Sequence, residues 1–321
     1  MQLYDIIIVG AGPAGMSAAI YTSRRALSTL VISKDIGGQA AATDIIENYP
    51  GYELINGFEL MQKFMSQAKK TGAEFKSGEV MSIIKNSDDT YTVKTLIEEY
   101  QAKCIILGFG LTPRDLGVPG EKELMYKGIT HCATCDGPLF KGKDVVIVGG
   151  GNSALEAVEY MSKIANKIYG VVRGDKYKGE QITIDKIGSY SNVEIMYNAA
   201  ISEIKGTGKV ESVIIGSTIE GATTEPREII TQGVIVEIGY IAKTGWVADL
   251  VKLNERKEII TDRDNMTSDP GVFACGDVSD ITYKQAVISA GEGAKAALQA
   301  AKYLASKSGK NVLLGTDWGK R

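Results

Sequence analysis

Two close cysteines and two glycine-rich runs are the features of this 321-residue chain that could carry chemistry. Cys132 and Cys135 are separated by two residues, which is the spacing of a redox-active dithiol. Residues 10–15, Gly-Ala-Gly-Pro-Ala-Gly, precede this pair, and residues 149–154, Gly-Gly-Gly-Asn-Ser-Ala, follow it. Both runs have the spacing of a dinucleotide-binding loop, whose third glycine position accepts alanine. Together these features predict a relay in which electrons enter at one nucleotide, cross a second and leave through the cysteines.

The first glycine run lies in a strand–turn–helix pattern. Residues 4–9 are apolar and rich in isoleucine, which predicts a parallel strand buried on both faces. Residues 14–25 predict a helix, and residues 29–33 predict the next strand. The three glycines allow a tight turn, the approach of a pyrophosphate and close helix–strand packing. We therefore expect the phosphates of a nucleotide at the start of this helix, where amide N–H groups lack partners.

The same pattern returns around the second glycine run. Residues 144–148 predict a strand, residues 152–165 a helix and residues 167–172 another strand. The alternative is a glycine turn in a plain doubly wound fold. The register of strand, turn and helix favours a second nucleotide site.

A third segment returns to the first site. Residues 267–277 read as a turn, an apolar strand and then Gly276-Asp277 at the carboxyl end of that strand, where parallel sheets bind ligands. The Asp277 carboxylate can accept hydrogen bonds from a polyol, and a final helix over residues 285–305 points its N-terminus at the same place. We therefore predict an α/β fold of two Rossmann-like, three-layer dinucleotide-binding domains, the second inserted in the first. The first domain comprises residues 1–113 and 248–321, and the second, which carries the cysteine pair, comprises residues 114–247.

The bulk composition excludes several classes of protein. The net charge is −3 and no run of five or more Lys or Arg appears, so a nucleic-acid partner is not expected. No uninterrupted apolar stretch reaches the ~20 residues of a membrane helix, and no export signal is visible, so we expect a cytoplasmic protein. Cys104 and Cys275 lie in apolar, strand-like runs and are expected to be buried core residues.

The motifs together resemble the low-molecular-weight thioredoxin reductase family of flavoproteins. The resemblance includes both glycine runs, residues 37–39 (Gly-Gly-Gln), residues 46–51 (Ile-Glu-Asn-Tyr-Pro-Gly), residues 132–137 (Cys-Ala-Thr-Cys-Asp-Gly), Gly276-Asp277 and residues 284–286 (Lys-Gln-Ala). Residues 135–140 and 283–294 also resemble the reductase portion of alkyl hydroperoxide reductase flavoproteins. The similarity runs along nearly the whole chain.

This resemblance implies cofactors, roles and partners. It implies that Cys135 is the thiol next to the flavin, that Cys132 attacks a protein disulfide and that Asp136 is the acid/base residue. It also implies a homodimer and a thioredoxin or thioredoxin-like partner. The implied nucleotides are FAD in the first domain and a nicotinamide dinucleotide in the second. The residues expected to bind FAD are Gly10, Gly12, Pro13, Ala14, Gly15, Lys34, Gly38, Gln39, Asn48, Asp277, Gln285 and Ala286, and those expected to bind NAD(P)H are Gly149, Gly151, Asn152, Ser153, Arg173 and Lys178.

The chemistry of the cysteine segment follows from its residue types. A thiolate is the nucleophile of disulfide exchange, and a helix starting at the Asp-Gly-Pro sequence after Cys135 would stabilise it. Asp136 would exchange the proton of the flavin-side thiol, and capping this helix is its alternative role. A zinc site is excluded for lack of ligands, since there is no second Cys-x-x-Cys. His131, the only histidine, either favours the Cys132 thiolate when protonated or is a solvated loop residue.

The nicotinamide donor is less firmly indicated. Members of this family that use NADPH carry a His-Arg-Arg cluster followed by another Arg, whereas here only Arg173 and Lys178 match. No acidic residue lies directly at the strand end, which disfavours a strict NADH enzyme, although Asp175 is near. We therefore favour NADPH and keep NADH as the alternative.

Three other functions remain open: an NADH-dependent reductase of a peroxiredoxin-linked carrier, a disulfide oxidase, and a non-catalytic FAD-binding redox sensor. The intact second nucleotide motif disfavours the oxidase and the sensor. In the C-terminal tail, Trp318 either belongs to a surface tail or packs over a neighbouring site such as the flavin.

Overall fold

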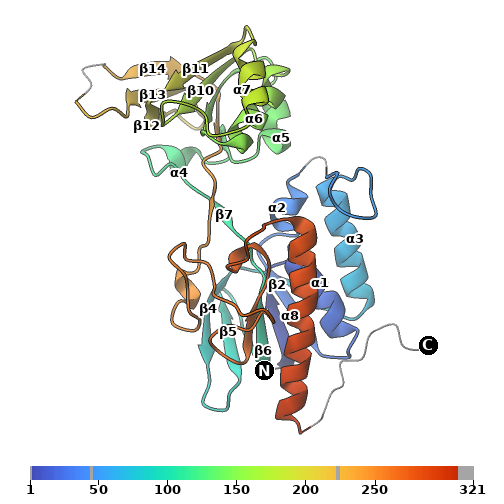
Figure 1. Ribbon diagram of the computed structural model, residues 1–321. Helices are drawn as coiled ribbons and strands as arrows, with labels where there is room; N and C mark the ends of the chain where they lie inside the picture. The colour runs from blue at the N-terminus through green and yellow to red at the C-terminus, as the bar shows by residue number, and fades with distance from the viewer. Residues whose placement is uncertain (1, 44–45, 222–224, 310–321) are drawn as a thin grey trace. The chain divides into compact units, whose positions relative to one another are not determined.

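The computed structural model describes residues 2–43, 46–221 and 225–309 (Figure 1). The chain splits into two compact units, each of which is described here by itself. Unit 1 comprises Met1–Thr112 and Ala242–Arg321, and unit 2 comprises Pro113–Ile241. Unit 2 is therefore inserted in unit 1. The two crossings run through β7 (Thr112–Pro113) and β16 (Tyr240–Ile241), which pair as a short two-stranded sheet.

Seven strands form the sheet of unit 1, namely β1 (Leu3–Val9), β2 (Thr29–Ser33), β3 (Glu74–Ser77), β4 (Val80–Lys85), β5 (Tyr91–Thr95), β6 (Glu99–Leu107) and β17 (Val272–Ala274). Their order is β3-β2-β1-β6-β5-β4, and β17 also pairs with β6. The strands β3, β2, β1, β6 and β17 pair in parallel, whereas β5 runs antiparallel to both of its neighbours, β4 and β6. Val9 and Ala274 both pair with Leu107, so β1, β6 and β17 end together at one edge of the sheet.

Helices and short turns cover this sheet: α1 (Pro13–Ser23), α2 (Gly38–Ala41), α3 (Gly57–Lys70), α8 (Ala286–Lys307) and the 3-10 helices η2 (Gly245–Val247) and η3 (Gly276–Val278). Helix α1 packs against both α3 and α8, as Figure 1 shows. The contact with α8 is close because a Cβ at Gly293 would lie 2.0 Å from the carbonyl oxygen of Ala14. Separate apolar cores lie on the two faces of the sheet, one including Ile6, Ile8 and Ala297, the other Ile7 and Ile259.

Unit 2 has a five-stranded parallel sheet and a three-stranded antiparallel one. The parallel sheet has the order β11-β10-β9-β15-β8, and the antiparallel sheet the order β12-β13-β14. The strands are β8 (Ile129–Thr130), β9 (Asp144–Val148), β10 (Lys167–Val172), β11 (Val193–Tyr197), β12 (Ala199–Lys205), β13 (Ser212–Ser217), β14 (Arg227–Ile230) and β15 (Gly233–Val236); the helices are α4 (Glu121–Leu124), α5 (Ala133–Asp136), the 3-10 helix η1 (Gly137–Phe140), α6 (Asn152–Ser162) and α7 (Gln181–Gly188).

The parallel sheet of unit 2 brings three connections to one edge. Val148 of β9 pairs with Val236 of β15 and with Val171 of β10, while Ile235 pairs with Thr130 of β8. The segments that follow β8, β9 and β15 therefore start side by side. The two helix-covered sheets, one wholly and one mainly parallel, and the inserted second unit confirm the predicted fold class.

The predicted helix ends need small corrections. Helix α1 ends at Ser23 rather than at residue 25, because Arg25 and Ala26 donate to Thr22 and Ser23 in a tighter turn and Ala26 has a φ of 56°. Helix α6 ends at Ser162 rather than at residue 165, and α8 extends to Lys307. The strands predicted over residues 29–33, 144–148 and 167–172 have the predicted bounds.

Candidate active site

The first glycine loop joins β1 to α1 at a point where side chains have no room. Gly10 has a φ of +106°, and a Cβ there would lie 2.5 Å from the carbonyl oxygen of Gly108. A Cβ at Gly15 would lie 1.9 Å from the carbonyl oxygen of Gly10. Gly12 precedes α1 in an extended conformation, and no side chain in the described ranges caps this helix. The first turn of α1 therefore presents its N–H groups to an anion.

The segment after β2 is held against this loop. Ala11 donates its N–H to the Ser33 hydroxyl at 3.2 Å, and Gly37 donates to the carbonyl oxygen of Ala11 at 2.8 Å. Gly38 donates to the Asp35 carboxylate at 3.1 Å. These bonds bring Lys34 and Gly38, both exposed, beside residues 10–15, and Gln39 follows with its amide donating to the carbonyl oxygen of Leu111 at 3.1 Å.

Asp277 reaches the same loop from the other end of the chain. Gly276 has a φ of +71°, and a Cβ there would lie 2.9 Å from the Cβ of Ala14. The hydroxyl of Ser289, in the first turn of α8, donates to Asp277 Oδ1 at 3.0 Å. Asp277 is partly exposed, so its second carboxylate oxygen can accept a hydrogen bond from a ligand.

Lys284 fixes the backbone that carries Asp277. Its ammonium donates to the carbonyl oxygens of Asp277 and Ser279 at 2.9 and 3.0 Å, and it pairs with Glu258 at 2.9 Å. Next to it, Gln285 Oε1 accepts a 3.1 Å hydrogen bond from Asn48 Nδ2. The structure therefore brings the residues expected to bind FAD to the first glycine loop, to the 34–39 segment, to Asp277 or to the start of α8.

The second glycine loop repeats this design in unit 2. Gly149 has a φ of +155°, and a Cβ there would lie 2.2 Å from the carbonyl oxygen of Glu237. Gly151 precedes α6 in an extended conformation, and no described side chain caps α6. Asn152 and Ser153 are exposed in the first turn. The first turn of α6 thus presents its N–H groups in the same way as that of α1.

Exposed cations surround a buried tyrosine after β10. Arg173 and Lys178 are both exposed, and the Lys178 N–H donates to the carbonyl oxygen of Gly150 at 2.6 Å. Between them Tyr177 is 4% exposed and packs edge-on against Tyr197 at 6.0 Å. The buried ring anchors the loop, and the backbone hydrogen bond of Lys178 joins the loop to the second glycine loop. Asp175 is also exposed in this loop.

The cysteine segment follows β8 at the same edge of the sheet. Cys132 is disulfide-bonded and lies directly before α5, which includes Cys135. The side chain of Cys135 lies outside the described part of the structure. The helix expected at Asp-Gly-Pro is η1, a 3-10 helix that begins at Gly137. Cys104 and Cys275 are free and fully buried, as predicted.

Asp136 bonds backwards rather than capping the helix that follows it. It occupies the N-cap of η1, yet its side chain makes no capping hydrogen bond there. Its carboxylate instead accepts a hydrogen bond from the Thr130 hydroxyl. The Thr130 hydroxyl oxygen in turn accepts a hydrogen bond from the N–H of Cys132 at 3.1 Å. The capping alternative is therefore wrong. Asp136 is connected through Thr130 to the backbone of Cys132.

His131 is not the solvated loop residue of the second alternative, because its side chain is only 15% exposed. Its Nδ1 lies 3.4 Å from the carbonyl oxygen of Val236, and its Nε2 lies 3.8 Å from an Asp115 carboxylate oxygen. The ring is therefore held against the end of β15.

No motif in the sequence marks Glu237, yet it lies among these groups. It follows β15 directly, and its N–H donates to the carbonyl oxygen of Val148 at 2.7 Å. Burial raises the pKa of its carboxyl to about 7. The N–H of Ala133 lowers this pKa by a smaller amount, and the like charge of Glu156 adds a small increase. The available signal was a carboxylate at the carboxyl end of a buried strand, the same signal that identified Asp277.

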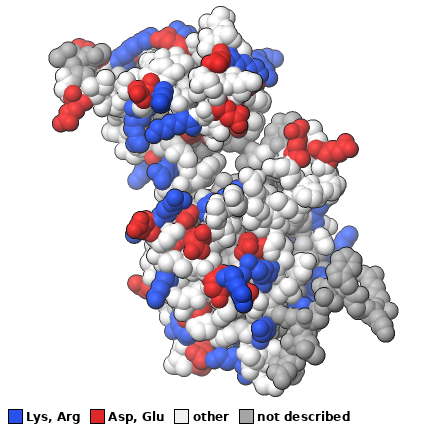
Figure 2. Space-filling view, viewed as in Figure 1, with Lys and Arg blue, Asp and Glu red and all other residues white. Residues whose placement is uncertain are grey.

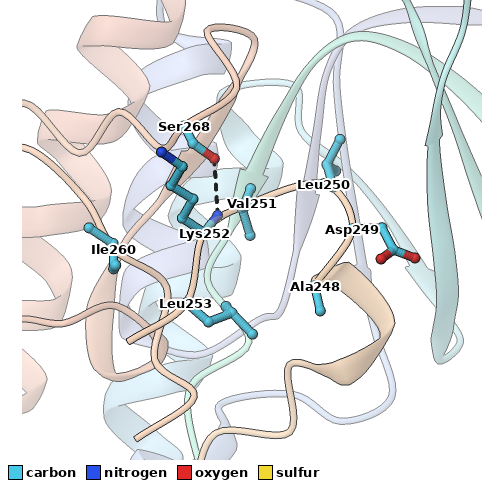
Figure 3. Close-up of a pocket in the computed structure, with 8 residues that line it drawn as sticks. All are labelled: Ala248, Asp249, Leu250, Val251, Lys252, Leu253, Ile260 and Ser268. Carbon is cyan, nitrogen blue, oxygen red and sulfur yellow. Dashed lines mark hydrogen bonds between the residues drawn. The ribbon is translucent and has the colours of Figure 1, made fainter. Parts of the chain in front are cut away.

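A hollow of about 380 Å³ lies elsewhere in unit 1 (Figure 3). Its lining is residues 248–253 with Ile260 and Ser268, and the N–H of Lys252 donates to the Ser268 hydroxyl at 3.0 Å. None of the predicted site residues lines it. It therefore plays no part in the site built from the glycine loops.

Metal binding and membrane spanning find no supporting residues in the part of the chain that the structure describes. There, no cluster of three His, Cys, Asp or Glu side chains could hold a metal ion, and no helix is long and apolar enough to cross a membrane. On the face shown in Figure 2, acidic and basic side chains of the described residues are interspersed. Trp318 and the tail lie outside the described residues.

The chain matches the family model described as "Pyridine nucleotide-disulphide oxidoreductase" over residues 4–293. It is 40% identical to thioredoxin reductase of Bacillus subtilis over 305 residues, which cover 94% of this chain and 95% of the relative. It is 38% identical to an alkyl hydroperoxide reductase subunit of Staphylococcus aureus, covering 94% of this chain but 59% of that protein.

Solved structures agree with this match. The fold is similar to the crystal structure of Lactococcus lactis thioredoxin reductase (FR conformation), with a TM-score of 0.82, 34% identity and coverage of 94% of this chain and 99% of the other. It is also similar to T. acidophilum thioredoxin reductase, with a TM-score of 0.79, 38% identity and coverage of 96% and 99%. The glycine loops, the cysteine segment and these similarities agree, and the chain belongs to the pyridine nucleotide-disulphide oxidoreductase family.

Proposed function

We propose that this protein is a thioredoxin-disulfide reductase, which passes electrons from NAD(P)H through FAD to a Cys132–Cys135 disulfide and on to a thioredoxin-like protein. The observation that carries the proposal is the disulfide-bonded Cys132 at the same sheet edge as the second glycine loop, in a chain that is similar over 94% of its length to a thioredoxin reductase. A redox sensor or a plain FAD-binding protein has no need of this second nucleotide loop.

The residues of unit 1 fit FAD. The uncapped start of α1 suits a pyrophosphate, because its first-turn N–H groups point outward and glycines 10 and 15 leave no room for side chains. Asp277 offers a free carboxylate oxygen to a polyol such as the ribityl chain, and the Asn48–Gln285 pair presents amide groups nearby. When bound, FAD supplies two-electron transfer between a pyridine nucleotide and a disulfide.

The residues of unit 2 fit a nicotinamide dinucleotide, and we propose that it is NADPH. The start of α6 would bind the pyrophosphate through Gly149, Gly151, Asn152 and Ser153. Arg173 and Lys178 are the exposed cations for a 2′-phosphate, and the residue directly after β10 is Arg173 rather than an acid. Initial rates with both nucleotides test this assignment, and a clear preference for NADH contradicts it.

The cysteine pair performs the exchange. In the reduced enzyme the Cys132 thiolate attacks one sulfur of the partner disulfide, which breaks that bond and forms a mixed disulfide. Cys135 then attacks Cys132, which releases the partner as a dithiol and restores the Cys132–Cys135 disulfide. Asp136 lies in the same segment and is proposed to exchange the proton of the Cys135 thiol, with Thr130 holding its carboxylate in place.

The experiment is a Cys135→Ser variant assayed with NADPH and thioredoxin. We expect loss of thioredoxin reduction while FAD remains bound, because the flavin-side sulfur is removed but the FAD-binding residues are untouched. Turnover at the wild-type rate in this variant would refute the relay. A Cys104→Ser variant is the matched control, since that free thiol is buried in the core and lies outside the proposed relay.

The similarity to alkyl hydroperoxide reductase favours a second candidate, an NADH-dependent reductase of a peroxiredoxin-linked carrier. Rates with a panel of carriers, including thioredoxin, a glutaredoxin-like protein and a peroxiredoxin carrier, separate the two. Homodimer assembly and a cytoplasmic location stay predictions, and sedimentation of the purified chain tests the first.

A further inference from the structure

A carboxylate that the proposed relay leaves unused lies beside the redox segment. The strand order β9-β15-β8 puts the end of β15 between the second glycine loop and the cysteine segment. Glu237 is the first residue after β15, and its carbonyl oxygen lies where a Gly149 side chain would be. The preceding carbonyl, of Val236, faces the ring of His131.

The Glu237 carboxylate interacts with the backbone at the start of α5. The N–H of Ala133, which directly follows Cys132, stabilises its charged form. Ala133 is joined directly to Cys132, so the Glu237 carboxylate lies beside the backbone of that cysteine.

Like charges and burial destabilise the charged form of the Glu237 carboxyl group. Glu156 on α6 acts on Glu237 with the same charge. Burial and, to a smaller extent, the charge of Glu237 raise the pKa of Tyr240 on β16. On the cysteine side, Asp136 is bonded to Thr130, and His131 is turned to Val236 and Asp115. Within the described ranges Glu237 forms no ion pair with a cation. Burial therefore raises its pKa to about 7, within the range where thiols of redox motifs also titrate.

We propose that Glu237 is the proton acceptor for Cys132, a role separate from that of Asp136. The step transfers one proton from the Cys132 thiol to the Glu237 carboxylate, giving a thiolate and a neutral carboxyl group. When Cys132 attacks the partner disulfide, the second sulfur of that disulfide is released as a thiolate within the partner, and the same proton passes to it from Glu237. No electrons are transferred in this step, so the two-electron thiol–disulfide exchange described above is unchanged.

This role rests on the proposed function, but its test does not depend on turnover. In the full chain carrying Cys135→Ser, Cys132 has no cysteine at position 135 with which to form a disulfide, and Cys104 and Cys275 are buried. The rate of its alkylation by iodoacetamide, followed by mass spectrometry of its peptide between pH 5 and 10, reports its titration with no nucleotide or thioredoxin present.

The test compares Glu237→Gln, Glu237→Asp and Glu159→Gln in that background. With Glu237 present we expect two coupled ionisations in the alkylation profile. Glu237→Gln should give a single ionisation, with the Cys132 midpoint lowered by about one pH unit because a neighbouring negative charge is gone. Glu237→Asp should restore two ionisations. Glu159 lies on α6 and pairs with Lys186, so Glu159→Gln should leave the profile unchanged.

The outcomes are exclusive. A Glu237→Gln profile that superimposes on its parent overturns the proposal, and so does an equal shift in Glu159→Gln. If Glu237→Gln shifts the profile while the wild-type enzyme fails to reduce thioredoxin, the proton coupling stands and the proposed function fails. Flavin content and circular dichroism of each variant confirm that the compared proteins are folded.

Discussion

The contact between α1 and α8 predicts opposite effects on stability for the same substitution at two glycines of α8. Gly293 and Gly291 both lie in α8, but only Gly293 faces α1. A methyl group at Gly293 would lie 2.0 Å from the carbonyl oxygen of Ala14 and 2.8 Å from its carbon, both of which are backbone atoms. At Gly291 no heavy atom lies within 4 Å of the built Cβ. Gly293→Ala and Gly291→Ala therefore differ in packing while sharing the same gain in helix propensity.

The expected magnitudes have opposite signs. Alanine in place of glycine inside a helix stabilises by about 1 kcal/mol, so Gly291→Ala should raise the free energy of unfolding by that amount. Overpacking costs about 1–3 kcal/mol, and the upper end applies at Gly293 because neither backbone can rotate away. Gly293→Ala should therefore lower the free energy of unfolding by about 2 kcal/mol net. At about 2 °C per kcal/mol for a chain of this size, the two variants should melt about 6 °C apart.

The assay is thermal unfolding of both variants, followed by circular dichroism, together with the flavin absorbance of each purified protein. Because Ala14 lies in the first turn of α1, displacement of α8 should also reduce FAD retention in Gly293→Ala but not in Gly291→Ala. A Gly293→Ala protein that melts at or above Gly291→Ala would refute the packing argument.

Three further predictions concern single side chains. Lys284→Met should weaken FAD binding by about tenfold in a flavin titration, since Asp277 loses the ammonium that fixes its carbonyl and Glu258 loses its partner; unchanged affinity would contradict this. Arg173→Ala should raise the KM for NADPH by about tenfold, leaving kcat and the KM for NADH unchanged; an equal change for both nucleotides would oppose a phosphate contact. Glu237→Gln should stabilise the protein at pH 8 by about 3 kcal/mol and have no effect near pH 4, as checked by urea unfolding at both values. The sign follows from the raised pKa of Glu237 in the folded protein, because ionisation of its carboxyl destabilises the fold as pH rises from about 4.5 to 7. Glutamine does not ionise and therefore removes that loss of stability. A variant that is less stable than the wild type at pH 8 would show that the carboxylate is favourable where it lies.

Local pattern was enough to predict the nucleotide-binding halves. The strands around the second glycine run were predicted with their bounds, because short apolar runs flanked by glycine turns and polar helices leave few alternatives. The position of Asp277 beside the first glycine loop was predicted for the same reason, since a carboxylate soon after a buried parallel strand lies at the edge where such sheets bind ligands. Helix ends were less well predicted, because the tight turn of Arg25 and Ala26 depends on hydrogen bonds rather than on apolar spacing.

The missing part of the site depends on contacts between distant segments. Glu237 lies beside Ala133 only because β15 inserts between β8 and β9, an order that no local pattern contains. The bond of Asp136 to Thr130 likewise connects a helix start to the preceding strand, so capping was the wrong expectation. His131 has little exposure for a related reason, since the end of β15 covers its ring.

The strand β6 has a consequence for how the chain is made. Its first half pairs with β5, which precedes it, but Ile105 to Leu107 pair with β17, whose residues are translated only after the whole of unit 2. Unit 2 is one continuous segment, so all its strands exist before the last strand of unit 1 emerges from the ribosome. A folded insertion, closed at its base by the pairing of β7 with β16, brings the ends of the interrupted domain together and lowers the entropic cost of adding β17. Synthesis therefore completes the cysteine-bearing unit first, and the sheet expected to hold the flavin last.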